Sequence, residues 1–365
     1  TDANFRREDL QTWGVGHLKR RIGELYLLSV SAPELCRIPL SVYTDCLRIP
    51  KNADWQPFLY DVLMERATSF FASGERDSTG VALSSAAEFM AADLACADTL
   101  RGYCCALLLW RDWLRFHAKD ENKTAFIYVD LHRLSFAHQR STLKDKDERY
   151  LRQLANIAQT YAQWEMSAQA VFLQAEYWLD FYKNETPQEQ ETYKWAKKKA
   201  VDLINAHVDN YAAESIGRQR LLGLRALIEK NIFSFVVEPI VPQHIPVLVS
   251  INYRNVKKMH YRVVAHTAET WQILGYESDT SRFEHLLSLP ALLSGEWNLP
   301  DVGDYRGHTT EGALSGLQAG NYCLLVSERA DFDMWKTGIL SYSSFQVSDL
   351  NYVSGDGKNY DEFYL

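Results

Sequence analysis

The spacing of apolar residues changes once along this chain, and that change constrains the fold more than any other feature. From about Phe5 to Ile232, apolar residues recur every three and four positions, which places them on one stripe of an α-helix. After Ile232 the period changes to two, the period of a β-strand. Pro239, Pro242 and Pro246 mark the change. The sequence therefore predicts a helical part followed by a β-sheet part.

The helical part is predicted to consist of pairs of helices. The clearest pair lies within residues 150–178, and a second pair lies within residues 196–228. Small alanines stand at the expected crossing points, and an aromatic residue stands at each helix end. A repeating helix pair of about 35–45 residues is typical of tetratricopeptide-type solenoids. We therefore expect an all-α, helical-repeat region.

Three segments are expected along the chain. Residues 1–80 form an N-terminal helical segment, residues 81–231 a helical-repeat, tetratricopeptide-like region, and residues 232–365 a β-sandwich. Within the second segment, Ser84 or Ser85 is expected to cap the start of a helix. Four prolines are expected to break the first segment into short helices and turns: Pro33, Pro39, Pro50 and Pro57.

The β part contains several short strand candidates separated by turns rich in Gly, Asn, Asp and Ser. The candidates are residues 232–238, 247–253, 259–266, 322–327, 339–347 and 350–353. Six or seven short strands favour a sandwich. Residues 317–322 resemble the corner where a sandwich strand begins, with the Tyr322 hydroxyl bonding back to the loop, which indicates an immunoglobulin-like fold. Residues 360–365 are strand-like and lack a closing element, so we interpret them as the start of a truncated next β-domain.

Composition excludes several classes of function. Lys and Arg number 39 against 47 Asp and Glu, a formal charge of −8, and the basic block of residues 197–199 is short, so nucleic-acid binding is disfavoured. No apolar stretch approaches the roughly 18 residues needed to cross a bilayer. The six cysteines form no Cys-x-x-Cys pair, which argues against a zinc site. Adjacent Cys104 and Cys105 are interpreted as buried free thiols.

The histidines do not form an evident metal site. His260 and His266 share a strand face but are roughly 20 Å apart. His132 and His138 are separated by roughly 240° around a helix. A loop metal site is left open by two pairs, His285 with His308 and Asp301 with Asp304. The sequence therefore assigns no catalytic, cofactor-binding or metal-ligating residue, implies no cofactor, and leaves the binding residues unknown.

Other groups have both a functional and a structural explanation. Carboxylates in residues 145–148 and 185–191 lie beside lysines, and a solvated helix face explains them. Trp110, Trp113 and Phe116 recur at helical spacing and could line a peptide groove, but core packing is the favoured explanation. No serine-hydrolase elbow or phosphate loop is present, and the glycines near residue 356 are interpreted as a hairpin turn. No enzyme is predicted.

Three strings resemble the first macroglobulin-like domain of bacterial alpha-2-macroglobulins of the Bacteroidetes type. Residues 246–263 contain Tyr-Arg-Asn and then an aromatic-Arg-Val strand, as that domain does. Residues 317–327 match its Leu-x-x-Gly-x-Tyr strand, and residues 342–352 its Phe-x-Val-Ser-x-Leu element. The helical part resembles the region before this domain through residues 58–71 and 168–178.

The resemblance implies that the complete protein is a broad-spectrum protease trap. In this family a cleaved bait segment triggers a conformational collapse, and in many members a Cys-Gly-Glu-Gln thioester captures the protease. The family places both features far downstream, and no cysteine of this chain begins that string, so no such residue carries over. The implied localisation is exported, periplasmic or in the cell envelope. The implied partners are the downstream macroglobulin domains and the target proteases.

Two functional hypotheses follow. The first is a non-catalytic N-terminal fragment of an alpha-2-macroglobulin-like inhibitor, serving as a structural frame or a partner-docking region. The alternative is a helical-repeat module of a cell-envelope receptor or scaffold, binding a peptide or protein on its concave face. Exposed Tyr and Trp side chains gathered on one concave side would favour the alternative, and scattered aromatics would favour the frame.

Overall fold

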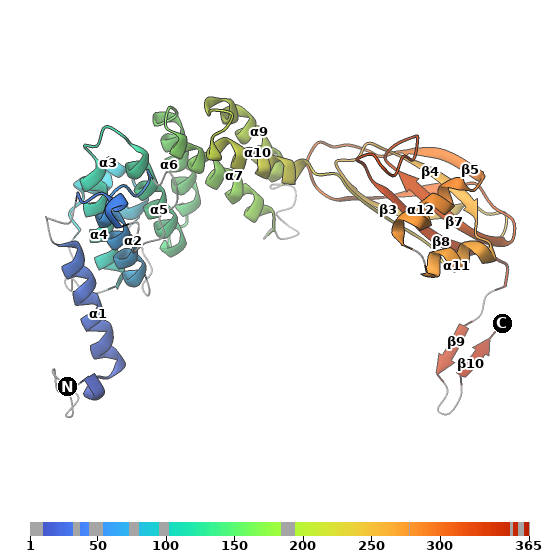
Figure 1. The fold of residues 1–365 in the computed structure, drawn as a ribbon, viewed down its shortest axis with the longest axis horizontal. Helices are drawn as coiled ribbons and strands as arrows, with labels where there is room; N and C mark the ends of the chain where they lie inside the picture. The colour runs from blue at the N-terminus through green and yellow to red at the C-terminus, as the bar shows by residue number, and fades with distance from the viewer. Residues whose placement is uncertain are drawn as a thin grey trace. The chain divides into compact units, whose positions relative to one another are not determined.

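The structure, a computed structural model, has a helical region followed by a β-sheet region (Figure 1), which confirms the predicted order. It describes residues 10–31, 37–43, 54–72, 80–94, 102–183, 194–276, 278–350, 353–356 and 361–364. The chain divides into two compact units. The helical unit comprises residues 1–184 and 199–225, and the β-unit comprises residues 185–198 and 226–365.

The helical region contains helices of very different length. They are α1 (Val15–Val30), α2 (Leu59–Phe71), α3 (Ala86–Ala91), α4 (Gly102–His117), α5 (Thr124–Arg140), α6 (Lys146–Thr160), α7 (Ala168–Lys183), α9 (Ala196–His207) and α10 (Ile216–Glu229), with 3-10 turns η1 (Leu10–Thr12), η3 (Leu40–Tyr43), η4 (Val81–Leu83), η5 (Glu165–Ser167) and η6 (Val208–Asn210). The expectation of only short helices before residue 80 is wrong for α1, which runs for 16 residues. No proline precedes Pro33, so nothing breaks that helix.

Helices are present at the positions of both expected pairs. The pair predicted within residues 150–178 is α6 and α7, which pack against each other, and the second pair corresponds to α9 and α10. Ala168 is buried at the start of α7, where a Cβ on Gly217 of α10 would lie only 2.7 Å from the Ala168 Cβ. Small residues therefore allow these two helix ends to approach closely.

The predicted helix cap is Ser85. Its hydroxyl accepts a hydrogen bond from the Glu88 amide, and the Glu88 carboxylate accepts one from the Ser85 amide. This reciprocal capping box begins α3.

Large aromatic and aliphatic side chains fill the core of the helical unit. Trp113 is fully buried, and its ring stacks on Trp110 with the centroids 5.4 Å apart, which confirms core packing for these two tryptophans. Arg133 is also fully buried. It pairs with Asp130 at 2.6 Å and donates to the Ala82 carbonyl, so its charge is neutralised and hydrogen-bonded.

The β-unit contains two larger sheets and a hairpin. The three-stranded sheet has the order β1 (Ile232–Val237), β3 (Val247–Arg254), β6 (His308–Leu314). The five-stranded sheet has the order β2 (Ile240–Val241), β8 (Leu340–Val347), β7 (Gly320–Ser327), β4 (Lys258–Ala265), β5 (Ala291–Asn298). Strands β9 (Val353–Asp356) and β10 (Asp361–Tyr364) form the hairpin, and among these pairings only β2–β8 is parallel.

One apolar core receives side chains from both larger sheets. Val249 and Ile251 of β3 meet Leu324 and Val326 of β7 in it. The Tyr322 hydroxyl donates to the Gln318 carbonyl at 2.9 Å, which confirms the predicted bond back to the loop. Two facing sheets with a shared core form a sandwich-like arrangement.

The five-stranded sheet has a second covered face that the sequence analysis missed. Cys323 and Leu325 alternate with the core residues of β7 and pack with Leu286 in a separate cluster. Leu286 belongs to α12 (Asp279–Ser288), which follows α11 (Ala268–Tyr276). Strands β5 and β6 were also missed, and the strand expected at residues 350–353 begins at Val353. The terminal strand expected at residues 360–365 corresponds to β10.

Candidate binding cleft on the helical unit

A cleft of about 780 Å³ lies on the helical unit where residues of α5, α7 and the start of α10 come together. Ligand-binding clefts in proteins commonly measure about 300–1,000 Å³ and are lined by apolar and aromatic side chains. The apolar and aromatic lining residues here are Trp55, Tyr128, Leu131, Met166, Ala168, Phe172, Leu173 and Ile216. The cleft therefore has both the size and the lining of a binding site.

Carboxylates outnumber basic groups around this cleft. Asp54, Glu165 and Glu214 line it, against the single guanidinium of Arg220. That guanidinium lies 5.0 Å from the centroid of the Phe172 ring and is held against the wall. The cleft is therefore apolar with a net negative rim.

Local backbone interactions fix one end of the cleft. The Glu165 carboxylate accepts a hydrogen bond from the Gly217 amide at 3.1 Å, and the Ser215 hydroxyl accepts one from the Arg218 amide at 3.1 Å. Both bonds satisfy amides in the first turn of α10. The Glu165 bond also holds the beginning of α10, with exposed Ile216, beside η5.

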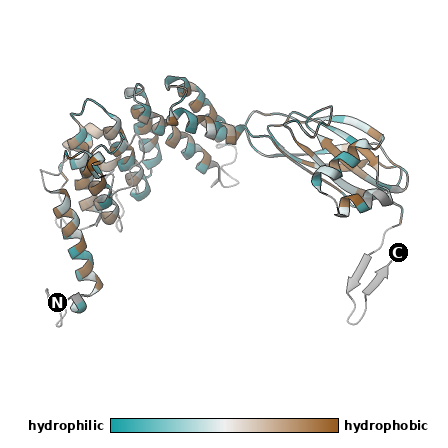
Figure 2. Ribbon diagram, in the orientation of Figure 1, coloured by the Kyte–Doolittle hydropathy of each residue, from teal (hydrophilic) through white to brown (hydrophobic). Residues whose placement is uncertain are grey.

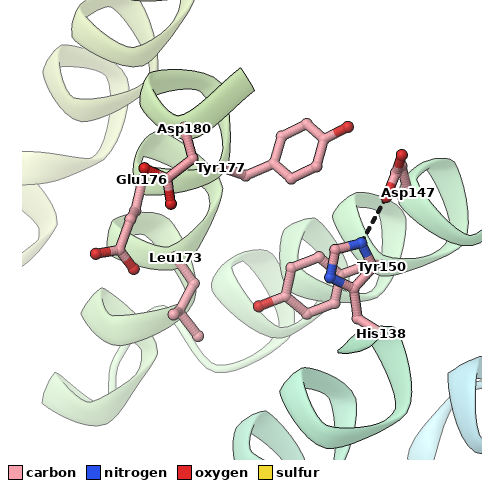
Figure 3. A pocket seen from close by; sticks show the side chains of 7 residues that line it. All are labelled: His138, Asp147, Tyr150, Leu173, Glu176, Tyr177 and Asp180. Atoms are coloured by element: carbon pink, nitrogen blue, oxygen red, sulfur yellow. Dashed lines mark hydrogen bonds and ion pairs between the residues drawn. The ribbon is translucent and has the colours of Figure 1, made fainter. Parts of the chain in front are cut away.

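A smaller hollow of about 270 Å³ adjoins the cleft through Leu173, which lines both (Figure 3). On one side, His138 Nε2 lies 2.5 Å from Asp147 Oδ1, and the His138 ring stacks on Tyr150 at 4.3 Å. On the other side, Glu176 and Asp180 project from α7. The hollow therefore adds three carboxylates, one of them paired with a histidine, to the negative surroundings of the cleft.

A buried ionic cluster lies elsewhere in the helical unit and joins α2 to α4. His117 is fully buried, and its Nε2 and Nδ1 atoms lie 2.7 Å from Asp61 and 2.6 Å from Asp120. Burial works to lower the pKa of His117, but the hydrogen bonds and charges of Asp61 and Asp120 outweigh it and raise that pKa. Asp61 also accepts hydrogen bonds from Trp113 Nε1 and the Phe58 amide. Because three protein groups donate to the buried Asp61 carboxylate, we interpret Asp61 as a structural group.

The pairs that left a loop metal site open are engaged with other partners. His285 Nε2 lies 3.1 Å from the Thr270 hydroxyl, and His308 Nε2 lies 2.9 Å from Asp304. Asp301 accepts a hydrogen bond from the Gly303 amide and pairs with a lysine. Within the described ranges, no group of three or more His, Cys, Asp or Glu side chains is arranged to hold a metal ion.

Of the two carboxylate-rich segments noted in the sequence, residues 145–148 lie on the described part of the chain. Asp145 pairs with Arg149 one turn later at 2.8 Å, a solvated helix-surface interaction. The second run, residues 185–191, lies outside the described residues.

The sequence analysis did not identify the cleft. Phe172, which belongs to the helix pair predicted within residues 150–178, lines the cleft beside Trp55 and Tyr128. These three aromatics are half-buried, unlike Trp110 and Trp113. The four-residue spacing of Tyr128 and His132, whose rings lie 4.2 Å apart, was an available signal for one wall.

The cysteines differ from their predicted state. Cys104 is disulfide-bonded, so its interpretation as a free thiol is wrong. Cys105 and Cys323 are free and buried, and burial raises the pKa of the Cys105 thiol to about 11. The sequence rule failed because spacing alone does not reveal which cysteines meet in space.

Comparison with known proteins gives no match for this chain, either among protein-family models or among curated proteins. In the portion of the chain that the structure describes, no helix has the length and apolar character required for a membrane span.

Proposed function

We propose that this chain is a non-catalytic structural frame within an exported, alpha-2-macroglobulin-like protease-trapping protein, with a helical-repeat region followed by an immunoglobulin-like macroglobulin domain. The observation that carries the proposal is where the resembling strings fall. Residues 246–263 span β3 and β4, residues 317–327 include β7, and residues 342–352 include most of β8. These strands supply most of the shared core, so the resemblance lies in the residues that build the domain.

The disulfide at Cys104 supports the exported location in this proposal. Disulfides persist in the periplasm and outside the cell and are rare in a reducing cytosol. Cys104 is disulfide-bonded in a unit that already has an extensive apolar core. The proposed partners are therefore further macroglobulin domains and proteases met outside the cytoplasm.

The test is a protease assay with two substrates. A trap blocks a protease from a large protein substrate but leaves its action on a small chromogenic peptide intact. The full-length protein should show this pattern with trypsin, and the 365-residue chain alone should inhibit neither reaction. Stoichiometric inhibition of both reactions by the chain alone would contradict the frame role. A coding sequence lacking further β-domains would contradict it as well.

The cleft specifically favours the second candidate function, binding of a polypeptide by the helical unit. Its apolar floor suits aliphatic and aromatic side chains, and the excess of carboxylates suits a basic segment. We propose an extended peptide that alternates apolar and basic side chains as the ligand class.

A matched pair of substitutions on α10 tests this second function. Ile216 lines the cleft and is 65% exposed, whereas Leu227 is 62% exposed and is not among the lining residues. With a fluorescein-labelled peptide of alternating Leu and Lys, Ile216→Arg should reduce binding measured by anisotropy, and Leu227→Arg should not. Equal effects of the two substitutions, or no binding by the unmodified chain, would refute it.

A further inference from the structure

Helix α1 carries an apolar stripe that faces solvent. Five of its aliphatic side chains are between 40% and 69% exposed: Val15, Leu18, Ile22, Leu25 and Leu28. Their spacing of three and four places them along one side of the helix. Burial of such side chains is strongly favoured, so a stripe of this length indicates a surface that another body covers.

Another part of the α1 surface is anchored to α2. Gly23 is the buried residue of α1, and a Cβ at this position would lie 3.2 Å from the Phe71 ring. The Tyr26 ring lies 5.1 Å from the Phe70 ring. The anchoring residues lie in the second half of α1, and its first turns extend away from α2 (Figure 1). Tyr26 lies one turn after Ile22, so this contact borders the stripe, whose five aliphatic side chains nevertheless remain exposed.

Basic residues accompany the stripe. Lys19, Arg20 and Arg21 are consecutive and exposed, and Glu24, the one acidic residue of α1, pairs with Arg21 at 3.0 Å. At about 100° per residue, Lys19 and Arg21 fall on the two flanks of the stripe formed by Val15, Leu18, Ile22 and Leu25. Apolar and polar residues both run along the helix (Figure 2). This basic run, which the sequence analysis passed over, stands out in a chain with a net charge of −8.

We propose that α1 lies in the headgroup region of an anionic lipid surface. The aliphatic stripe enters the boundary with the acyl chains, and the flanking Lys19 and Arg21 side chains contact the phosphate groups, whereas Arg20 faces away from them. A basic, amphipathic, short helix has the chemistry of an interfacial membrane helix, and negative headgroups complement its local charge. The inference does not depend on the protease-trap proposal.

A second copy of the chain is the competing occupant. The stripe has coiled-coil spacing at Val15, Leu18, Ile22 and Leu25, but the next heptad position is Ser29. Two heptads are fewer than the three or four that indicate a coiled coil. The charge of the flanks and the short length of the stripe therefore favour lipid.

Vesicle co-sedimentation of the 365-residue chain tests the proposal. The chain should bind vesicles of equal parts phosphatidylglycerol and phosphatidylcholine, bind less in high salt, and fail to bind vesicles of phosphatidylcholine alone. Replacing the flanking Lys19 and Arg21 by Gln should weaken binding about 25-fold, at about fivefold for each basic residue near an anionic surface. Ile22→Glu should abolish binding.

The matched control is Val236→Glu. Val236 is 63% exposed on β1, in the β-unit, and this change should leave vesicle binding intact. Thermal melting followed by circular dichroism verifies that each variant is folded, and Leu18→Gln, also at an exposed position, replaces Ile22→Glu if the latter does not fold. Vesicle binding that is unchanged by the α1 substitutions would overturn the proposal. A dimer that requires the stripe, without vesicle binding, would assign it to a second copy and overturn the proposal too.

Discussion

The substitution Asp61→Asn should destabilise the helical unit strongly and in a pH-dependent manner. Asp61 is fully buried and accepts hydrogen bonds from three groups: Trp113 Nε1 at 2.8 Å, the Phe58 amide at 2.9 Å and His117 Nε2 at 2.7 Å. An Asn side chain keeps the shape, but it places an NH₂ group where one oxygen accepted a bond. It also removes the negative charge beside a histidine whose pKa is raised. Breaking a buried, hydrogen-bonded ion pair costs about 3–5 kcal/mol.

The pH dependence follows from the direction of the His117 shift. Despite its burial, Asp61 and Asp120 raise the pKa of His117 in the folded chain. The protonated ring donates to both carboxylates, whereas the neutral ring has a single N–H. The stabilisation is therefore complete below the unfolded histidine pKa of about 6.5 and is lost as pH rises through the higher folded value. The difference in unfolding free energy between the wild type and Asp61→Asn should therefore become smaller at alkaline pH.

Urea unfolding followed by circular dichroism at 222 nm measures this effect, because the helices of the helical unit dominate that signal. Asp120→Asn is the control, since the Asp120 side chain is 17% exposed and water can replace its bond to His117. Asp120→Asn should lower the free energy of unfolding by a smaller amount, about 1.5 kcal/mol. A loss below about 1 kcal/mol for Asp61→Asn, or a loss that is the same at every pH, would refute the reasoning, because a buried pair of this kind costs several times more.

Three further outcomes are expected. Tyr322→Phe removes the bond to the Gln318 carbonyl and should lower the unfolding free energy of the β-unit by about 1 kcal/mol, measured by urea titration. Gly312→Ala should cost about 1–3 kcal/mol in the same assay, because a Cβ there would lie 2.7 Å from the Trp297 ring; an unchanged value would show that the ring moves aside freely. Cys104→Ser should lower the melting temperature of the helical unit, and reduction with dithiothreitol should lower it by more in the wild type than in the variant.

The order of helices and strands could be predicted because it depends on the spacing of apolar residues that are close together in the sequence. The cap at Ser85 and the hydrogen bond from the Tyr322 hydroxyl to the preceding loop were predicted correctly, because each involves residues only a few positions apart. The helices α11 and α12 were missed because they are short and interrupt a run of strands. Strand β6 was missed because its outward positions are polar and its apolar pattern is correspondingly weak.

The cleft could not be predicted because its walls meet only in the folded unit. Trp55, Tyr128 and Ile216 are far apart in the sequence, and each one alone is an ordinary half-buried or exposed apolar residue. The contact between Asp61 and His117 likewise joins positions 56 residues apart. The periodicity of apolar residues cannot predict which distant residues meet, because their contacts depend on how the helices pack.

The free thiol of Cys105 follows disulfide-bonded Cys104 directly in the sequence, and its burial in the folded chain protects the disulfide from exchange. A thiolate attacks disulfides and a protonated thiol does not, so the raised pKa of about 11 keeps Cys105 inert next to bonded Cys104 at neutral pH. Once the chain opens, that protection ends, and the freed thiol can exchange partners with the adjacent bond. Heating at alkaline pH should therefore scramble the pairing and prevent recovery on cooling, whereas heating in mild acid should be reversible.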